Sequence, residues 1–159
     1  YIEDMFSVCI NELADIVITS AGGYPKDIDL YQTHKAMENA SLAVKKGGIM
    51  IVVGECRDGL GEGKFANALM EGLSPKELID ELKRNFVLGR HKASRVAKIH
   101  LDSEIYLISR LDENIKKNLF LKNYNSLEKA FADALKTQGT NAKVLAMPFG
   151  GSTLPSCKQ

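Results

Sequence analysis

The chain has 159 residues, 45% of them hydrophobic and 26% charged, and its 21 basic and 20 acidic residues leave a net charge of +1. This length fits one domain, since domains of about 100–150 residues are the commonest size. The balanced charge offers no clustered basic surface for nucleic acid, and no run of about 18 apolar residues could span a bilayer. We therefore expect a single domain over residues 1–159, with no nucleic-acid or membrane partner.

The cysteines also exclude two classes of protein. Cys9, Cys56 and Cys157 are an odd number and lack CxxC spacing, so neither a disulfide framework nor a zinc site is indicated. The N-terminal segment is acidic and does not resemble a secretion signal. A reducing, cytoplasmic setting is expected. The start at Tyr1, without an initiator methionine, suggests one domain of a longer protein.

The first predicted elements form a β-α-β unit. Residues 16–18 are a short apolar, β-branched run that is typical of a buried strand. Asp27 is a candidate N-cap for a helix that continues to about Lys46, where Gly47-Gly48 would end it. Residues 49–53 are apolar throughout, which indicates a second strand buried on both faces.

Helices and strands continue to alternate along the rest of the chain. The patterns predict helices over 64–70, 75–84, 92–100 and 127–138, and strands over 105–108, 119–121 and 143–147. The helix that Ser126 would cap is the clearest, because Leu127, Ala130 and Ala134 recur at helical spacing and Gly139 would close it. This alternation predicts an α/β fold, a Rossmann-like three-layer sandwich with a mostly parallel sheet flanked by helices.

Three loops would meet at one edge of this sheet. Residues 20–29, 54–63 and 149–154 each follow a predicted strand, and right-handed crossovers place such loops on the same side. Open α/β sheets bind their ligands at this carboxyl edge. The Gly150-Gly151 loop offers backbone amides and hydroxyls there, but the sequence assigns it no individual role.

The first of these loops carries the clearest candidate site. It contains Gly22 and Gly23 and runs into a helix start that bears Tyr31, Gln32 and Lys35 at spacings of three and four. An ammonium attracts a carboxylate, an amide bonds a hydroxyl or carboxylate oxygen, and a phenol donates, so the set suits a 2-hydroxy acid. The same residues are also typical of a tight turn followed by a solvated helix face. No GxGxxG or GxxxxGK[ST] spacing supports a nucleotide site.

Other reactive side chains carry weaker signals. Cys56 lies beside Arg57, which would favour a thiolate nucleophile, but no histidine base accompanies it and loop packing is the favoured interpretation. His34 could line the site or point outward. His91 and Lys92 are further candidates for the lining, in a basic cluster that could close over an acid or stay solvated. No HxH or HExxH motif indicates a complete metal site within the chain.

His100 lies near the end of a predicted helix. We interpret it as a C-terminal helix residue that the helix dipole favours in its charged form.

Several segments together resemble one known family. They are SAGGYPKDIDLYQTHKA, KKGGIMIVVGECRDGLG, GRHKA and MPFGGSTLP, in this order, and they cover nearly the whole chain. The set resembles the C-terminal domain of the nickel-dependent lactate racemase family. The resemblance implies an enzyme in which a nickel pincer nucleotide accepts hydride from the α-carbon of lactate and returns it to either face. It also implies that the cofactor is held mainly by an N-terminal domain, whose motifs this sequence lacks.

The resemblance also implies roles for individual residues. The family's LYQxxK segment matches residues 30–35, so Tyr31, Gln32 and Lys35 would position the substrate, with Lys35 pairing its carboxylate. The family's lactate enzymes place a tryptophan over the substrate from a region near residues 90–93, whereas this chain has no tryptophan and reads His91-Lys92 there. A different 2-hydroxy acid is therefore compatible with the resemblance, and the isolated domain is expected to be inactive.

Two other functions stay open from the residues alone. One is a non-catalytic α/β module that binds a small acid or a nucleotide. The other is an ordinary nucleotide-dependent oxidoreductase, which the missing glycine fingerprint disfavours.

Overall fold

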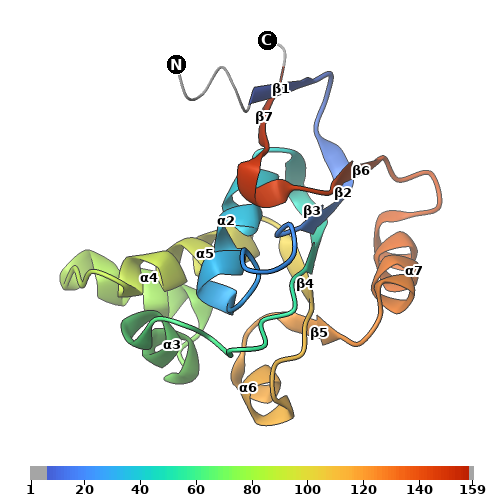
Figure 1. The fold of residues 1–159 in the computed structure, drawn as a ribbon. Helices are drawn as coiled ribbons and strands as arrows, with labels where there is room; N and C mark the ends of the chain where they lie inside the picture. Colours follow the sequence, from blue (N-terminus) through green and yellow to red (C-terminus); the bar gives the residue numbers. More distant parts are fainter. Residues whose placement is uncertain (1–6, 158–159) are drawn as a thin grey trace.

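A computed structural model describes residues 7–157 of the protein (Figure 1). Within these residues, five parallel strands form the main sheet in the order β5-β4-β3-β2-β6, and β1 pairs with β7 in a second, two-stranded sheet. The strands are β1 Ser7–Ile10, β2 Ala14–Ser20, β3 Val44–Val53, β4 Glu104–Ile108, β5 Lys122–Tyr124, β6 Val144–Met147 and β7 Leu154–Cys157. The helices are α2 Leu30–Ala40, α3 Gly63–Met70, α4 Pro75–Arg84, α5 Arg90–Asp102, α6 Glu113–Asn118, α7 Leu127–Gln138 and the 3-10 helix η1 Gly150–Ser152.

Helices cover both faces of the main sheet (Figure 1). Helix α7 packs its Ala130 and Ala134 on one face, against a small cluster that includes Ile49 and Ile51 of β3. The alternate β3 residues, including Met50, face the larger core under α2, α3, α4 and α5. Strand β3 is therefore buried on both sides, as its uninterrupted apolar run indicated. The predicted α/β fold, a parallel sheet flanked by helices, is confirmed.

The strand order reverses at β2, and this reversal positions the site. The chain moves from β2 through β3, β4 and β5 in one direction, and β6 then lies on the other side of β2. In open α/β sheets, ligands bind outside the carboxyl ends of the two strands at such a point. Here the loops that leave these ends are residues 21–29 after β2 and residues 148–153 after β6.

Helix α2 is shorter than the sequence pattern predicted. Its N-cap is Asp29, whose Oδ1 accepts the Gln32 N–H at 2.6 Å, and not Asp27. Asp27 instead accepts the Glu55 N–H through Oδ2 at 3.0 Å, so it joins the loops after β2 and β3. The helix ends at Ala40 rather than near Lys46, because the chain turns at residues 41–43 and enters β3.

The prediction that Gly47-Gly48 ends a helix is also wrong, since both glycines lie within β3. Ala14 pairs with Val44 and Ile16 pairs with Ile49, so β3 bulges between these two pairs. Gly47 has a φ of +78°, which favours glycine, and a Cβ on Gly48 would lie 2.8 Å from the Asp15 carbonyl oxygen. Glycine in this strand therefore serves a bulge and a close backbone approach.

Three further elements differ from the expectation. Helix α6 was not predicted, the strand expected over 119–121 begins later as β5, and the β1–β7 sheet was missed. In that sheet Ser7 pairs with Leu154, so residues from opposite ends of the sequence lie side by side (Figure 1). A pairing over so long a separation leaves no local signal in either segment.

Candidate functional site

The first turn of α2 presents two of the predicted side chains together. Asp29 caps the helix on the Gln32 N–H, which fixes where the next turn begins. Gln32 and Lys35 then lie on the same side of the helix, and the Lys35 ammonium donates to Gln32 Oε1 at 3.1 Å. The structure therefore brings Gln32 and Lys35 together, as their spacing indicated.

These two side chains line a cavity at the carboxyl edge of the sheet. The cavity has a volume of about 170 Å³, and it is lined by Ala21, Lys26, Gln32, Lys35 and Gly151. Ala21 and Lys26 belong to the loop after β2 and Gly151 to the loop after β6, so the cavity lies at the strand-order reversal. Its size suits a small acid, because sites for drug-sized ligands are usually about 300–1,000 Å³.

Tyr31 belongs to a neighbouring cluster and does not line this cavity. Its ring is half-buried, with its centroid 5.5 Å from that of Phe65 in an edge-to-face arrangement. Lys92 Nζ donates to the Tyr31 hydroxyl at 2.7 Å and lies 3.9 Å from the ring centroid. Lys92, from the first turn of α5, thus contacts Tyr31, and the Tyr31 ring faces α3 and α5.

Glycines shape the two loops that border the cavity. Gly22 and Gly23 have φ values of +104° and +75°, so this turn favours glycine at both positions. A Cβ on Gly150 would lie 2.0 Å from Oγ1 of the buried Thr19. Asn39 holds the same loop by donating to the Gly150 carbonyl at 2.7 Å. The Gly150-Gly151 loop therefore packs directly on β2 and α2 and brings Gly151 to the cavity.

The three residues of the basic cluster, 90–92, each have different neighbours in the structure. Arg90 forms ion pairs with Glu71 and Glu81, and its hydrogen bonds with Glu71 raise the pKa of Arg90 and lower that of Glu71. His91 packs on Phe86 at 5.7 Å, in a cavity between α4 and α5, and its Nδ1 accepts the Gly89 N–H. His91 is therefore not brought to the cavity of Lys35, and Lys92 approaches it only through Tyr31.

Two further histidines are fully or partly buried. His34 is 1% exposed, so outward exposure is excluded; its Nδ1 donates to the Tyr31 carbonyl, and burial lowers its pKa although Glu38 lies 3.8 Å from Nε2. His100 packs on Phe120 at 5.4 Å, and burial lowers its pKa as well. His100 does lie in the last turn of α5, as predicted. Its burial opposes the positive charge that the helix dipole would favour there.

Cys56 is a packed thiol and not an activated nucleophile. It is 1% exposed, and its Sγ lies 3.5 Å from the Thr33 hydroxyl. Burial raises the pKa of the Cys56 thiol to about 11, although the Thr33 hydrogen bond opposes the shift. A thiol that stays protonated at neutral pH does not attack substrates, so loop packing is the interpretation that holds.

The raised thiol pKa predicts a loss of stability in alkali. The folded chain keeps the Cys56 proton to about pH 11, whereas an unfolded thiol ionises near 9.0. The unfolding free energy should therefore fall as the pH rises through this interval, by at most about 2–3 kcal/mol from this group. Urea unfolding from about pH 8 to about pH 10.5 should show a steeper loss in the wild type than in Cys56→Ala. Parallel curves for the two proteins would contradict the assignment.

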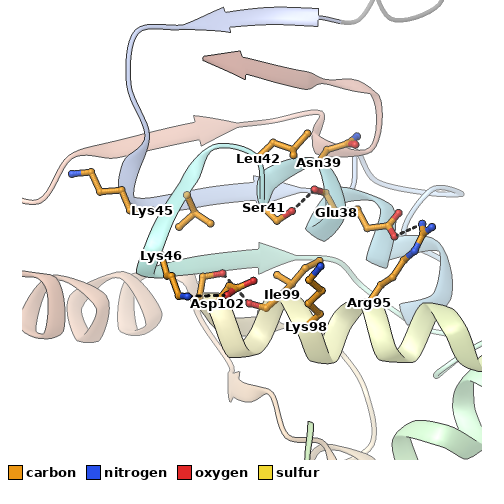
Figure 2. A pocket seen from close by; sticks show the side chains of 12 residues that line it. Glu38, Asn39, Ser41, Leu42, Lys45, Lys46, Arg95, Lys98, Ile99 and Asp102 are labelled. Atoms are coloured by element: carbon orange, nitrogen blue, oxygen red, sulfur yellow. Dashed lines mark hydrogen bonds and ion pairs between the residues drawn. The ribbon is translucent and has the colours of Figure 1, made fainter. Parts of the chain in front are cut away.

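A larger cavity lies elsewhere, at the amino ends of the strands. It measures about 650 Å³ and lies between α2, the start of β3 and α5 (Figure 2). Figure 2 shows two ion pairs between side chains that line it, Lys46 with Asp102 at 3.8 Å and Arg95 with Glu38 at 2.9 Å. Four of its charged side chains are thus paired, and it lies at the edge opposite to the one where open α/β sheets bind ligands. The smaller cavity at the carboxyl edge is therefore the better candidate.

The described side chains form no cluster of typical metal ligands. Between residues 7 and 157, no three His, Cys, Asp or Glu side chains come together in a group that could hold a metal ion. Over the same residues, no helix has both the length and the hydropathy needed to cross a bilayer.

Lys26 lines the cavity but was not among the residues predicted to do so. The only signal for it was a basic residue in the loop after a predicted strand, at the edge where ligands bind. Phe65, which supports Tyr31, gave no signal beyond helical periodicity.

Comparison with known proteins supports the fold and shows the family. A sequence model of the lactate racemase C-terminal domain family matches residues 10–154. The lactate racemase of Lactiplantibacillus plantarum is 31% identical over 141 residues, which are 86% of this chain and 33% of that protein. The lactate racemase of Thermoanaerobacterium thermosaccharolyticum is 28% identical over 146 residues, which are 89% of this chain and 34% of that protein. The chain thus spans about a third of the length of these curated relatives.

Solved structures agree with this result. The lactate racemase apoprotein from T. thermosaccharolyticum superposes with a TM-score of 0.89 at 26% identity, covering 98% of this chain and 38% of that one. A protein from Thermotoga maritima superposes with a TM-score of 0.61 at 14% identity, covering 96% of this chain and 39% of that one, and shares the fold.

Proposed function

The chain belongs to the lactate racemase C-terminal domain family, and we propose that it is a single α/β domain forming the substrate-binding wall of a larger 2-hydroxy acid racemase. The observation that carries this proposal is the cavity at the strand-order reversal. Lys35 and Gln32 meet in it, and no carboxylate side chain lines it. The remainder of the full-length protein would form the opposite wall.

The donors at this wall match a 2-hydroxy carboxylate. The Lys35 ammonium has three N–H groups and donates one to Gln32 Oε1, so two remain for hydrogen bonds to a substrate carboxylate. The Gln32 side chain keeps both of its amide N–H donors for a substrate oxygen. The bond between the two side chains also limits their rotation, which orients the carboxylate before reaction.

Tyr31 would act beside this pair. Lys92 donates to its hydroxyl oxygen, so the hydroxyl hydrogen is left to donate to a substrate oxygen. The edge-to-face contact with Phe65 holds the ring in place. Tyr31 and Lys92 lie outside the cavity, on the side of α5, so they would contact a substrate group that reaches beyond it. Gly22 and Gly23 would shape the loop that borders it.

The chemistry at the α-carbon would come from outside this chain. By the family resemblance, a nickel pincer nucleotide would be held mainly by an N-terminal domain. When bound there, such a group supplies hydride acceptance and return at the α-carbon. The residues of this chain would bind the acid, orient it and help exclude water, in a cytoplasmic enzyme whose isolated C-terminal domain is inactive.

Racemisation by the full-length protein tests this function. The protein, loaded with its cofactor, should convert either enantiomer of a 2-hydroxy acid into a racemic mixture, which chiral chromatography would follow for lactate, 2-hydroxybutanoate and malate. The residues of this domain expressed alone should convert none of them. Binding of these acids by a fully loaded protein that racemises none would contradict the proposal and favour a non-catalytic acid-binding module.

A further inference from the structure

The candidate cavity contains a second ammonium that a lactate molecule would not need. Lys26 lines it together with Lys35, although the two side chains come from different elements, the loop after β2 and helix α2. Lactate carries one carboxylate, which Lys35 and Gln32 would hold in the proposed function. With lactate bound, the Lys26 ammonium would therefore have no negatively charged partner.

Neither lysine is neutralised by the protein. In the described part of the chain, Lys26 and Lys35 form no ion pair with a carboxylate. Other cations of the fold do, since Lys45 pairs with Asp15 at 2.7 Å and Arg95 pairs with Glu38 at 2.9 Å. Two unpaired ammoniums on one small cavity raise its positive potential and favour a ligand with two negative charges.

The loop backbone directs Lys26 toward the edge of the sheet. A Cβ placed on Gly22 would lie 3.4 Å from Lys26 Cδ and 4.0 Å from Lys26 Nζ, so the lysine folds back over this glycine. The same Cβ would lie 3.8 Å from the Phe149 ring, which belongs to the loop after β6. The Lys26 ammonium thus lies beside the junction of the two loops that border the cavity.

We propose that Lys26 is a specificity-determining residue that binds a second carboxylate, so that the preferred substrate is a 2-hydroxy dicarboxylic acid rather than lactate. Lys35 and Gln32 would hold the carboxylate next to the hydroxyl-bearing carbon, and Lys26 would hold the distal one. This inference rests on the proposed function, because it assigns both groups to one substrate.

Binding to the cofactor-free, full-length protein provides the test. Malate and 2-hydroxybutanoate differ only in a carboxylate that replaces a methyl group, so calorimetric titration with both isolates the second charge. Malate should bind about tenfold more tightly or better, which is the gain expected from one charge-assisted hydrogen bond. The advantage should shrink as salt is added, because the cavity is open to solvent.

Matched variants assign this preference to Lys26. Lys26→Met keeps an unbranched side chain of nearly the same length without the ammonium and should reduce the malate advantage to about twofold or less, whereas Lys26→Arg should retain it. Lys76→Met removes a lysine from the exposed surface of α4 and should leave the ratio unchanged. A wild type that binds both acids equally, or a Lys26→Met variant with an unchanged ratio, would overturn the inference.

The outcomes also separate this inference from the proposed function. Racemisation of lactate by a protein with no preference for malate would overturn the role of Lys26 and leave the racemase function standing. A malate preference that depends on Lys26, in a loaded protein that racemises no acid, would support the dicarboxylate site and contradict the racemase function.

Discussion

Replacing Lys35 with alanine in the full-length enzyme should lower kcat/KM for its 2-hydroxy acid by about 100- to 1,000-fold. The substitution removes the ammonium that would pair the substrate carboxylate and also frees Gln32 Oε1, which Lys35 contacts at 3.1 Å. The loss corresponds to about 3–4 kcal/mol of binding energy in the transition state. Initial rates of racemisation over a range of substrate concentrations would measure it.

Whether the loss appears in KM or in kcat tells whether Lys35 only binds the substrate or also orients it. If Lys35 only binds the carboxylate, KM should rise and kcat should change little; if it also orients the acid for reaction, kcat should fall too. Cofactor content should stay at the wild-type level. Lys46→Ala is the matched control, because this exposed lysine pairs with Asp102 at the opposite edge of the sheet. Unchanged kinetics in Lys35→Ala would remove Lys35 from the active site.

Replacing Phe65 with alanine should reduce the unfolding free energy of the chain by about 3–5 kcal/mol. Phe65 is 0% exposed, and its ring lies 5.5 Å from Tyr31 and 6.0 Å from His34 by their centroids. The substitution loses the apolar burial and leaves a cavity under the first turn of α2. Urea denaturation would give the loss directly, and the melting temperature should fall by on the order of 10 °C.

Phe86→Ala is the control for this second result. Phe86 is 67% exposed on the connection between α4 and α5, so its removal should change the unfolding free energy by about 0.5 kcal/mol or less. A loss in Phe65→Ala no larger than in Phe86→Ala would show that the Phe65 ring does not support the core as described. Because Tyr31 rests on Phe65, the same variant should also raise KM in the full-length enzyme.

Sequence patterns located most helices and strands of the main sheet. Ser74 and Glu77 form the capping box at the start of α4, and Ser126 caps α7 with Gly139 at its end, so these helices carry their own boundary signals. The buried run at residues 49–53 identified a central strand, because only a strand covered on both faces is apolar throughout.

The boundaries of α2 and β3 could not be read in the same way. Asp27 and Asp29 are both good N-cap residues, and the choice depends on the Glu55 N–H, which the loop after β3 brings to Asp27. Considered without its tertiary contacts, Gly47-Gly48 is typical of a helix end. Pairing with β2 makes the same residues a bulge, because the Asp15 carbonyl lies where a side chain would be.

The amino-acid sequence alone determined the parallel α/β class, the shared edge of the three loops and the proximity of Gln32 to Lys35. Each of these depends on periodicity, on the handedness of crossovers or on neighbours within one helix, which are local properties of a chain. Only the tertiary structure decided that Lys26 shares the cavity with Lys35, that Tyr31 turns toward Lys92 and that the thiol of Cys56 is buried. These contacts join different elements, and they form only where packing brings distant segments together.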